Sequence, residues 1–173
     1  MRIMPPQIVR RGPMSGSRVR FVSLLVAAAL AAMSAACSTG AASSSATAEP
    51  WGANAVTPAA LVKELASASA ADKPVVVYTG PAGLFRSGHI PGAVIHGPAA
   101  SPDGLSELTA WARSLPRSTS VVIYCGCCPV EDCPNIRPAY TAIKNLGFAR
   151  VRVLLLPHNF GTDWVAPGYP VEK

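Results

Sequence analysis

Short runs of apolar, mostly β-branched residues alternate along this chain with segments that carry a helical pattern. The apolar runs are 75–78, 94–95, 121–124 and 151–156, and the helical patterns span 58–70, 105–115 and 138–146. A run that is apolar at every position is typical of a strand buried on both faces, as in a parallel sheet. The alternation predicts an α/β fold, with a central parallel sheet flanked by helices and joined by right-handed crossovers.

Capping and breaking residues mark the ends of these helices. Thr57 followed by Pro58 is typical of an N-cap and a proline at the first helical position. Pro116 stops the second helix, and Gly147 is the expected C-terminal cap of the third. These signals predict one folded domain over residues 57–173.

The N-terminal residues 1–36 have the pattern of a secretory signal peptide. The segment 21–36 is uncharged, follows several arginines and ends in small residues. It is too short and too rich in alanine to predict a membrane span. Met14 is an alternative start that gives the signal peptide an n-region of ordinary length. We therefore expect export, to the periplasm or the cell exterior.

Residues 34–37, Ser-Ala-Ala-Cys, resemble a bacterial lipobox, although serine stands where an aliphatic residue is usual. We expect Cys37 to be lipidated, with ordinary signal-peptide cleavage nearby as the alternative. A lipoprotein modification attaches more than one acyl chain and so gives a stable anchor, whereas a single chain binds only marginally. Residues 37–56, which are mainly Ser, Thr, Ala and Gly up to position 50, are predicted to form a flexible linker. The sequence thus predicts a lipoprotein anchored to a membrane.

The net charge of +6 does not indicate a nucleic-acid partner. Five of the 15 basic residues are arginines that precede Cys37, where no acidic residue occurs. The rest of the chain has ten basic and nine acidic residues and is nearly neutral. A basic binding surface is therefore not predicted, and the sequence gives no indication of an oligomeric state.

Four cysteines lie within nine positions directly after the apolar run 121–124, namely Cys125, Cys127, Cys128 and Cys133. In an α/β fold the chain turns here from a strand into its helix, and the amide N–H groups of the turn and of the helix start lack partners. These donors and the helix dipole stabilise an anion above the strand end. Cys125 occupies that place, so we expect its pKa to be lowered and its thiol to be reactive.

The charges of the same loop act in opposite directions. Arg137 adds a positive charge at the far end of the loop. Glu131 and Asp132 oppose thiolate formation unless they are exposed or pair with Arg137.

The residues alone leave four interpretations of the cysteines open. Cys125 can be a single nucleophile that the other cysteines support or resolve. Cys125 and Cys128 have the Cys-x-x-Cys spacing of a redox dithiol. All four thiolates suit a soft metal such as zinc or copper(I), although their spacing differs from the paired knuckles of structural zinc. Two structural disulfides are permitted in an exported protein, although two bridges within so short a loop would be strained.

Several segments resemble signatures of rhodanese-like domains, in matching order and spacing. Residues 88–93, Gly-His-Ile-Pro-Gly-Ala, are similar to the turn motif of that family, and residues 121–125 to its strand leading to the active-site cysteine. Residues 146–151, together with Trp164 and the Gly-Tyr-Pro-Val-Glu of 168–172, resemble its C-terminal segments. The resemblance covers residues 57–173.

The resemblance implies a small α/β domain in which a catalytic cysteine carries sulfur as a persulfide from a small sulfur donor to a thiol acceptor, without a cofactor. On this pattern Cys125 is the nucleophile, and the substrate-binding loop comprises Gly126, Cys127, Cys128, Cys133 and Arg137. Arg137 stands where the family often has a basic residue, and another loop cysteine could resolve the persulfide to a disulfide. The expected function is that of an exported sulfurtransferase. Thiol–disulfide exchange by Cys125 and Cys128, and non-catalytic binding of zinc or copper by the four cysteines, are the alternatives.

The loop also departs from the family pattern. It is about twice the usual length, and Gly126 follows the nucleophile where arginine is common. Tyr78 and Gly80 stand where an Asp-x-Arg pair often lies. These departures leave the fold prediction intact but do not support thiosulfate as the substrate. Outside the loop, we expect His89 to bond to local backbone and Trp164 to pack beneath the loop.

Overall fold

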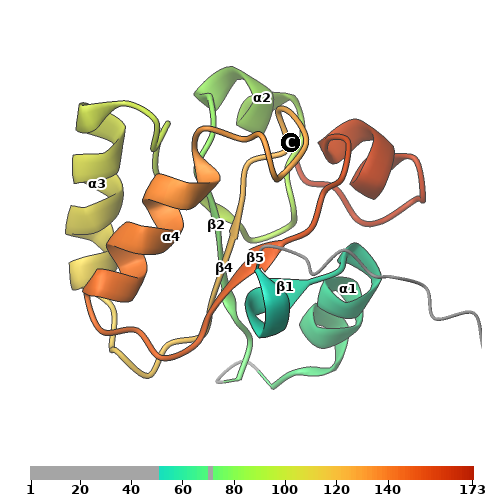
Figure 1. The fold of residues 1–173 in the computed structure, drawn as a ribbon. Helices are drawn as coiled ribbons and strands as arrows, with labels where there is room; N and C mark the ends of the chain where they lie inside the picture. Colours follow the sequence, from blue (N-terminus) through green and yellow to red (C-terminus); the bar gives the residue numbers. More distant parts are fainter. Residues whose placement is uncertain (1–50, 70–71) are drawn as a thin grey trace, which may run out of the picture. The chain divides into compact units, whose positions relative to one another are not determined.

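The computed structural model describes residues 51–69 and 72–173. Within them, five strands form one sheet in which every neighbouring pair is parallel, in the order β1-β5-β4-β2-β3 (Figure 1). The strands are β1 (Ala55–Val56), β2 (Val75–Tyr78), β3 (Val94–Ile95), β4 (Val121–Tyr124) and β5 (Val151–Leu154). The predicted central parallel sheet is confirmed, and the bounds of β2, β3 and β4 agree with the expected ones.

In the described residues, four α-helices accompany the sheet: α1 (Pro58–Ser67), α2 (Ala82–Ser87), α3 (Pro102–Arg113) and α4 (Ile136–Asn145). A 3-10 turn, η1 (Gly52–Asn54), precedes β1, and a π-helical turn, η2 (Gly161–Val165), follows β5. The helices α3 and α4 lie together on one face of the sheet and α1 lies on the other (Figure 1). The predicted α/β arrangement, with helices on both sides of a parallel sheet, is therefore present.

Alternate residues of the strands contribute to two hydrophobic clusters, one on each face of the sheet. Val77 and Ile123 pack in the cluster with α3 and α4, whereas Tyr78 and Tyr124 pack in the cluster with Leu61 of α1. This follows from the alternation of side chains along a strand. Every residue of β4 is buried, so the carboxyl end of this strand is held from both sides at the point where Cys125 follows.

The helix ends use the capping residues that the sequence predicts. Thr57 Oγ1 accepts a hydrogen bond from the amide of Ala60 at 3.3 Å, and Pro58 opens α1. Gly147 has a φ of +90° and donates its N–H to the carbonyl of Lys144 at 2.9 Å, which ends α4. A positive φ favours glycine because glycine lacks a Cβ.

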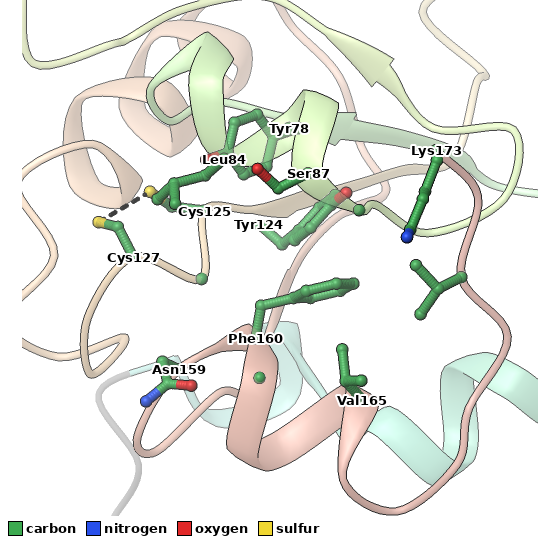
Figure 2. A pocket seen from close by; sticks show the side chains of 14 residues that line it. Tyr78, Leu84, Ser87, Tyr124, Cys125, Cys127, Asn159, Phe160, Val165 and Lys173 are labelled. Carbon is green, nitrogen blue, oxygen red and sulfur yellow. Dashed lines mark hydrogen bonds between the residues drawn. The ribbon is translucent and has the colours of Figure 1, made fainter.

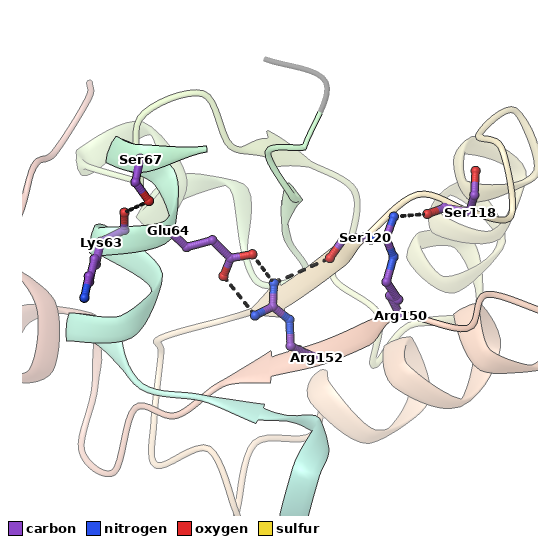
Figure 3. A network of polar contacts seen from close by, with 7 residues as sticks. All are labelled: Lys63, Glu64, Ser67, Ser118, Ser120, Arg150 and Arg152. Carbon is purple, nitrogen blue, oxygen red and sulfur yellow. Dashed lines mark hydrogen bonds and ion pairs between the residues drawn. The ribbon is translucent and has the colours of Figure 1, made fainter. Parts of the chain in front are cut away.

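An ion pair joins α1 to the sheet (Figure 3). Arg152 of β5 donates two hydrogen bonds to the Glu64 carboxylate of α1, at 2.7 and 2.8 Å, and a longer one to Ser120 Oγ at 3.5 Å. Arg152 faces α1 because it alternates with Val151 and Val153, which lie in the opposite cluster. The paired hydrogen bonds fix the position of α1 over β5.

Some elements differ from those that the sequence predicts. The strand β1 pairs with β5 at the edge of the sheet, so Ala55 and Val56 belong to the fold rather than to the predicted linker. Trp51 is also buried. The sequence predicts no element for the segment that forms α2. A helix of six residues is too short to show a clear periodicity.

The predicted signal peptide, the lipobox cysteine Cys37 and the linker up to residue 50 lie outside the described residues. Within residues 51–69 and 72–173, no helix is long and apolar enough to cross a membrane.

Candidate active site at the cysteine loop

Cys125 lies directly after β4, and its local backbone depends on the glycine that follows it. Gly126 has a φ of +75°, and a Cβ built on it would lie 2.6 Å from Phe160 Cβ. The carbonyl of Gly126 also accepts a hydrogen bond from the Phe160 amide at 3.0 Å. A side chain at this position would both strain the backbone and displace the segment after β5. The chain therefore has glycine beside Cys125 because two backbone segments meet there.

The four loop cysteines gather into one cluster of free thiols. Cys127 Sγ lies 3.2 Å from Cys125 Sγ, 3.2 Å from Cys128 Sγ and 3.9 Å from Cys133 Sγ. Figure 2 shows the contact between Cys125 and Cys127. Cys125 and Cys133 are buried, Cys128 is half-buried and Cys127 is exposed. Cys127 is thus the central thiol of the cluster and the one most open to solvent.

Three of these sulfur atoms are arranged closely enough to share a ligand. The Sγ atoms of Cys125, Cys127 and Cys133 all lie within 4.8 Å of one another. Soft thiolates of this kind suit copper(I) or zinc. Cys128 contacts Cys127 but does not join the three-sulfur set. The Cys-x-x-Cys spacing suggested Cys128 as the partner of Cys125. In the structure, Cys125 contacts Cys127 instead.

Arg137, predicted to close the loop, lies elsewhere. Its guanidinium carbon is 5.3 Å from the ring centroid of Trp51, and the side chain is exposed. The second residue of α4 points toward Trp51 and Tyr140, while Ile136 and Ala139 face the core. In the part of the chain that the structure describes, the Arg137 guanidinium therefore lies over Trp51 and does not pair with the cysteine thiols.

Glu131 and Asp132 are exposed. Neither forms an ion pair with Arg137 in the part of the chain that the structure describes. Of the two arrangements that the sequence allowed for these carboxylates, the exposed one is present.

Asn135 is a site residue that the sequence analysis missed. Its side chain is buried, donates from Nδ2 to Cys125 Sγ at 3.5 Å and accepts at Oδ1 from the Ala100 amide at 2.9 Å. The N–H donor of Ala100 requires an oxygen opposite it, which leaves the amide nitrogen facing the sulfur. An asparagine just before a helix usually indicates an N-cap, but this one makes no side-chain cap hydrogen bond. Only the tertiary structure reveals that it holds Cys125.

The pKa values of the cluster thiols shift in opposite directions, and that of Cys133 is the one that is lowered. Its pKa is lowered to about 5, chiefly because the Cys125 thiol bonds to its sulfur, with further donation from the Asn135 amide and the other two thiols. The same interaction with Cys133, together with burial, raises the pKa of Cys125. Burial, followed by hydrogen bonding to Cys127, raises the pKa of Cys128 to about 12. The prediction of a lowered pKa at Cys125 is therefore wrong, because a neighbouring thiol holds the charge.

A pocket of about 540 Å³ opens beside the cluster (Figure 2). Cys125 and Cys127 line it, whereas Cys128 and Cys133 do not. Its apolar lining comes from β2, α2, β4, η2 and the C-terminal segment, and consists of Tyr78, Leu84, Tyr124, Phe160, Val165 and Val171. The sulfur with the lowered pKa, that of Cys133, is therefore buried and outside the pocket lining, whereas Cys125 and Cys127 line the pocket.

Gly80 makes room for the reactive sulfur. A Cβ built at this position would lie 2.5 Å from Cys125 Sγ and 2.6 Å from the Tyr78 hydroxyl. Real Cβ atoms do not approach other atoms so closely, so the position requires glycine. Tyr78 itself donates a hydrogen bond to the Pro81 carbonyl at 3.2 Å. The sequence analysis noted these two positions as departures from a family pattern, and the structure gives them a steric role.

His89 has the structural role that the sequence predicts, and Trp164 is a packed core residue. His89 Nδ1 lies 3.0 Å from the Phe85 carbonyl, and its ring stacks on that of Phe85. Trp164 is buried and donates from Nε1 to the Pro170 carbonyl at 2.8 Å. Trp164 thereby contacts the C-terminal segment, and neither side chain lines the pocket beside Cys125.

Comparisons with known proteins agree with this architecture. No protein-family model and no curated protein matches the chain. Among solved structures, the Alr3790 protein from Anabaena is 21% identical, with 68% of this chain and 81% of that chain covered and a TM-score of 0.51. The BH2092 protein from Bacillus halodurans is 20% identical, with 68% and 75% covered and a TM-score of 0.53. The rhodanese-like domain of Alr3790, solved in solution, is 21% identical over 69% of this chain and 78% of that chain, with a TM-score of 0.49.

At these identities, the likeness describes the fold. The five-stranded parallel sheet with flanking helices is a rhodanese-like α/β fold, as the sequence motifs predicted. The cysteine cluster lies at the carboxyl end of β4 in this fold.

Proposed function

We propose that this protein is a sulfurtransferase that carries sulfur as a persulfide on Cys125. The observation that supports this most directly is the position of Cys125. Its sulfur follows the central strand β4 of a rhodanese-like fold, lines a pocket and lies 3.2 Å from a second thiol, Cys127. A reactive sulfur at the mouth of a pocket, with a partner thiol in contact, is the arrangement that sulfur transfer requires.

The first step is the attack of Cys125 on the outer sulfur of a donor R–S–SH. The proton of Cys125 passes to the Cys133 thiolate, which is the base of the cluster. A bond forms between Cys125 Sγ and the outer donor sulfur, and the bond between the two donor sulfurs breaks. The leaving thiolate takes the proton from Cys133 and departs as R–SH, which restores the charge on Cys133. Cys125 then carries the persulfide.

The second step releases the sulfur. An acceptor thiol can take the outer sulfur directly. Alternatively, Cys127 attacks Cys125 Sγ, a disulfide forms between the two residues, and hydrosulfide leaves with the proton of Cys127. The two cysteines lose two electrons, and the transferred sulfur gains them. Two equivalents of an external thiol then reduce the disulfide.

Sulfide release under reducing conditions tests this proposal. With a persulfide donor and excess thiol, we expect the full chain to release sulfide catalytically and the Cys125→Ser variant to lose the activity. Cys128→Ser is the matched control, because Cys128 does not line the pocket, and we expect it to retain most of the activity. Unchanged turnover in Cys125→Ser would rule out the proposed role.

A second candidate function is supported by the three-sulfur set. Cys125, Cys127 and Cys133 could hold copper(I) or zinc without catalysis, since their sulfurs lie within 4.8 Å of one another. Elemental analysis of protein purified under reducing conditions separates the two functions. One equivalent of tightly bound metal, lost on thiol alkylation, would favour the binding function over sulfur transfer.

We also propose that the protein acts outside the cytoplasm, anchored by lipid at Cys37. This rests on the arginine-rich start, the uncharged segment 21–36 and the lipobox-like residues 34–37. Export would place the loop thiols in an oxidising compartment, where a dedicated reductant or a persulfide must keep Cys125 and Cys127 from remaining a disulfide.

A further inference from the structure

The large apolar side chains that are exposed in the described residues gather at one place. Leu84, Val165 and Val171 are 48%, 47% and 38% exposed, respectively. All three line the pocket beside Cys125, although they come from α2, η2 and the C-terminal segment (Figure 2). Scattered exposed apolar residues need no explanation, but a group of them around a concave site indicates a binding surface.

The wall between these residues and the thiols is also apolar. Phe160 stands opposite Tyr124 with ring centroids 5.8 Å apart, and both line the pocket. The Tyr78 hydroxyl bonds to the Pro81 carbonyl, and the Tyr124 hydroxyl accepts from the Ile90 amide at 3.2 Å. The hydroxyl groups nearest the sulfur are therefore already engaged with the backbone.

Charged groups are scarce in the same space. Of the described residues that line the pocket, only Lys173 carries a formal charge. Gly126 and Gly80, which are next to Cys125 in sequence or in space, carry no side chain at all. A doubly charged inorganic anion would lose water on entering this pocket and meet a single ammonium group in return.

We propose that the sulfur donor is an organic hydropersulfide whose aliphatic or aromatic group occupies this pocket, with its outer sulfur against Cys125. The proposal rests on the proposed function and specifies its substrate class. Apolar contact with Leu84, Phe160 and Val165 binds the organic group, and Cys125 displaces the organic thiol as described above. Lys173 lies at the pocket and can pair with a carboxylate on the same donor. Thiosulfate is accordingly a poor donor.

Thiol-modifying probes test the pocket without relying on sulfur transfer. Benzyl methanethiosulfonate and its sulfonatoethyl counterpart react identically: the thiolate attacks the sulfenyl sulfur, a mixed disulfide forms and methanesulfinate leaves. The Cys127→Ser variant of the full chain is used, so that Cys127 cannot displace the adduct from Cys125. Peptide mass spectrometry measures the modification rate at Cys125, with Cys128 in the same protein as the internal reference.

We expect the benzyl reagent to modify Cys125 at least about tenfold faster than the charged reagent after normalisation to Cys128, since burying one side-chain-sized apolar group provides that much selectivity. Leu84→Glu should remove most of this preference. Leu84 is exposed, so the substitution leaves the core intact. Ala82→Glu is the matched control, because it puts the same charge on the exposed face of α2 outside the pocket, and it should keep the preference.

The same variants, together with two sulfur donors, separate the proposed substrate class from sulfur transfer itself. Equal rates for both probes, or a preference that Leu84→Glu leaves unchanged, would show that the apolar pocket does not determine which reagent reaches Cys125 faster. If benzyl hydropersulfide forms the Cys125 persulfide at least about tenfold faster than thiosulfate does, the substrate class is supported. Persulfide formed equally from both donors contradicts the substrate class and leaves sulfur transfer standing. A probe preference without a persulfide from any donor contradicts sulfur transfer and leaves the pocket standing.

Discussion

At the scale of single residues, the sulfur with the lowered pKa is not one of the two sulfurs that line the pocket. Cys133 is buried behind the pocket and carries the lowered pKa, while Cys125 and Cys127 line the pocket. Asn135 links the two parts, because its amide nitrogen bonds to Cys125 and its backbone N–H to Cys133. We therefore expect the reactivity of Cys125 to depend on Cys133 and Asn135, which do not line the pocket.

The pH dependence of the thiolate tests this separation. The pKa of Cys133 is lowered to about 5, so the thiolate is present at neutral pH and is lost as the pH falls through that value. Ultraviolet absorbance of the reduced protein should titrate with an apparent pKa near this value. Cys133→Ser should remove that transition. Cys128→Ser should retain it, because Cys128 is protonated at neutral pH. A transition that persists in Cys133→Ser would assign the charge to another sulfur.

Asn135→Asp isolates the role of the amide donor. The variant keeps an oxygen for the Ala100 amide but replaces the donor to Cys125 with a carboxylate, which disfavours a thiolate nearby. We expect the pH profile of Cys125 alkylation to move to higher pH, with little change in the rate at its plateau. Asn135→Ala additionally leaves the buried Ala100 N–H unpaired and should cost about 1–3 kcal/mol of stability. An unshifted profile in Asn135→Asp would show that the contact is merely structural.

Gly80→Ala tests the space allotted to the Cys125 sulfur. The added methyl group would overlap Cys125 Sγ and the Tyr78 hydroxyl, so we expect sulfide release to fall by at least about tenfold, as for a displaced reacting atom. Gly83→Ala is the control, because no atom lies within 4 Å of a Cβ at that position, and it should be active. Equal activity of the two variants would contradict the steric role of Gly80.

At the scale of elements, the parts with strong local signals were predictable and the parts that depend on tertiary contact were not. Continuous apolar runs gave β2 and β4, and Thr57 and Gly147 gave helix ends, because each signal acts within a few residues. The edge strand β1 is defined only by its pairing with β5. The position of the Arg137 side chain was not predictable for a similar reason: sequence gives the distance along a helix from the cysteines, but the side of α4 that faces Trp51 is set by packing.

The pairing of α1 with β5 through Glu64 and Arg152 should contribute modestly to stability. Both side chains are partly exposed, at 31% and 25%, so we expect a coupling energy of about 1 kcal/mol despite the two parallel hydrogen bonds. A double-mutant cycle with Glu64→Gln and Arg152→Met in urea denaturation measures it. Lys63→Met on the same helix is a control on an exposed residue and should have little effect. A coupling energy near zero would mean that burial alone holds α1.

At the scale of the whole molecule, the folded domain lies within residues 51–173 and the proposed export signal precedes it. The folded residues are nearly neutral, and the excess positive charge belongs to the N-terminal arginines. The motifs at residues 88–93 and 168–172 supported the fold prediction by their resemblance to a family, and the structure pairs their segments in a bridge between His89 and Glu172. The pocket was not predictable, because its walls join α2 to η2 and the C-terminal segment, and α2 is far from the other two in the sequence.

The proposed anchor makes a separate prediction for the intact protein in cells. Cys37→Ser should prevent incorporation of labelled fatty acid and should move the protein from the membrane fraction to the soluble fraction. Sulfide release by the folded domain should be unaffected, because Cys37 lies outside residues 51–173, which contain the loop and the pocket. Retention of the variant in the membrane fraction would contradict a lipid anchor at Cys37.

Mass analysis of the sulfur-loaded protein tests directly whether Cys125 carries the persulfide. The reduced full chain is treated anaerobically with benzyl hydropersulfide, the remaining thiols are alkylated, and the peptides are sequenced by mass spectrometry. We predict one added sulfur atom on Cys125 and none in the Cys125→Ser variant, with the Cys127→Ser variant accumulating the adduct because its resolving thiol is absent. Added sulfur on Cys133 or Cys128 in the wild-type chain, with Cys125 unmodified, would contradict the account.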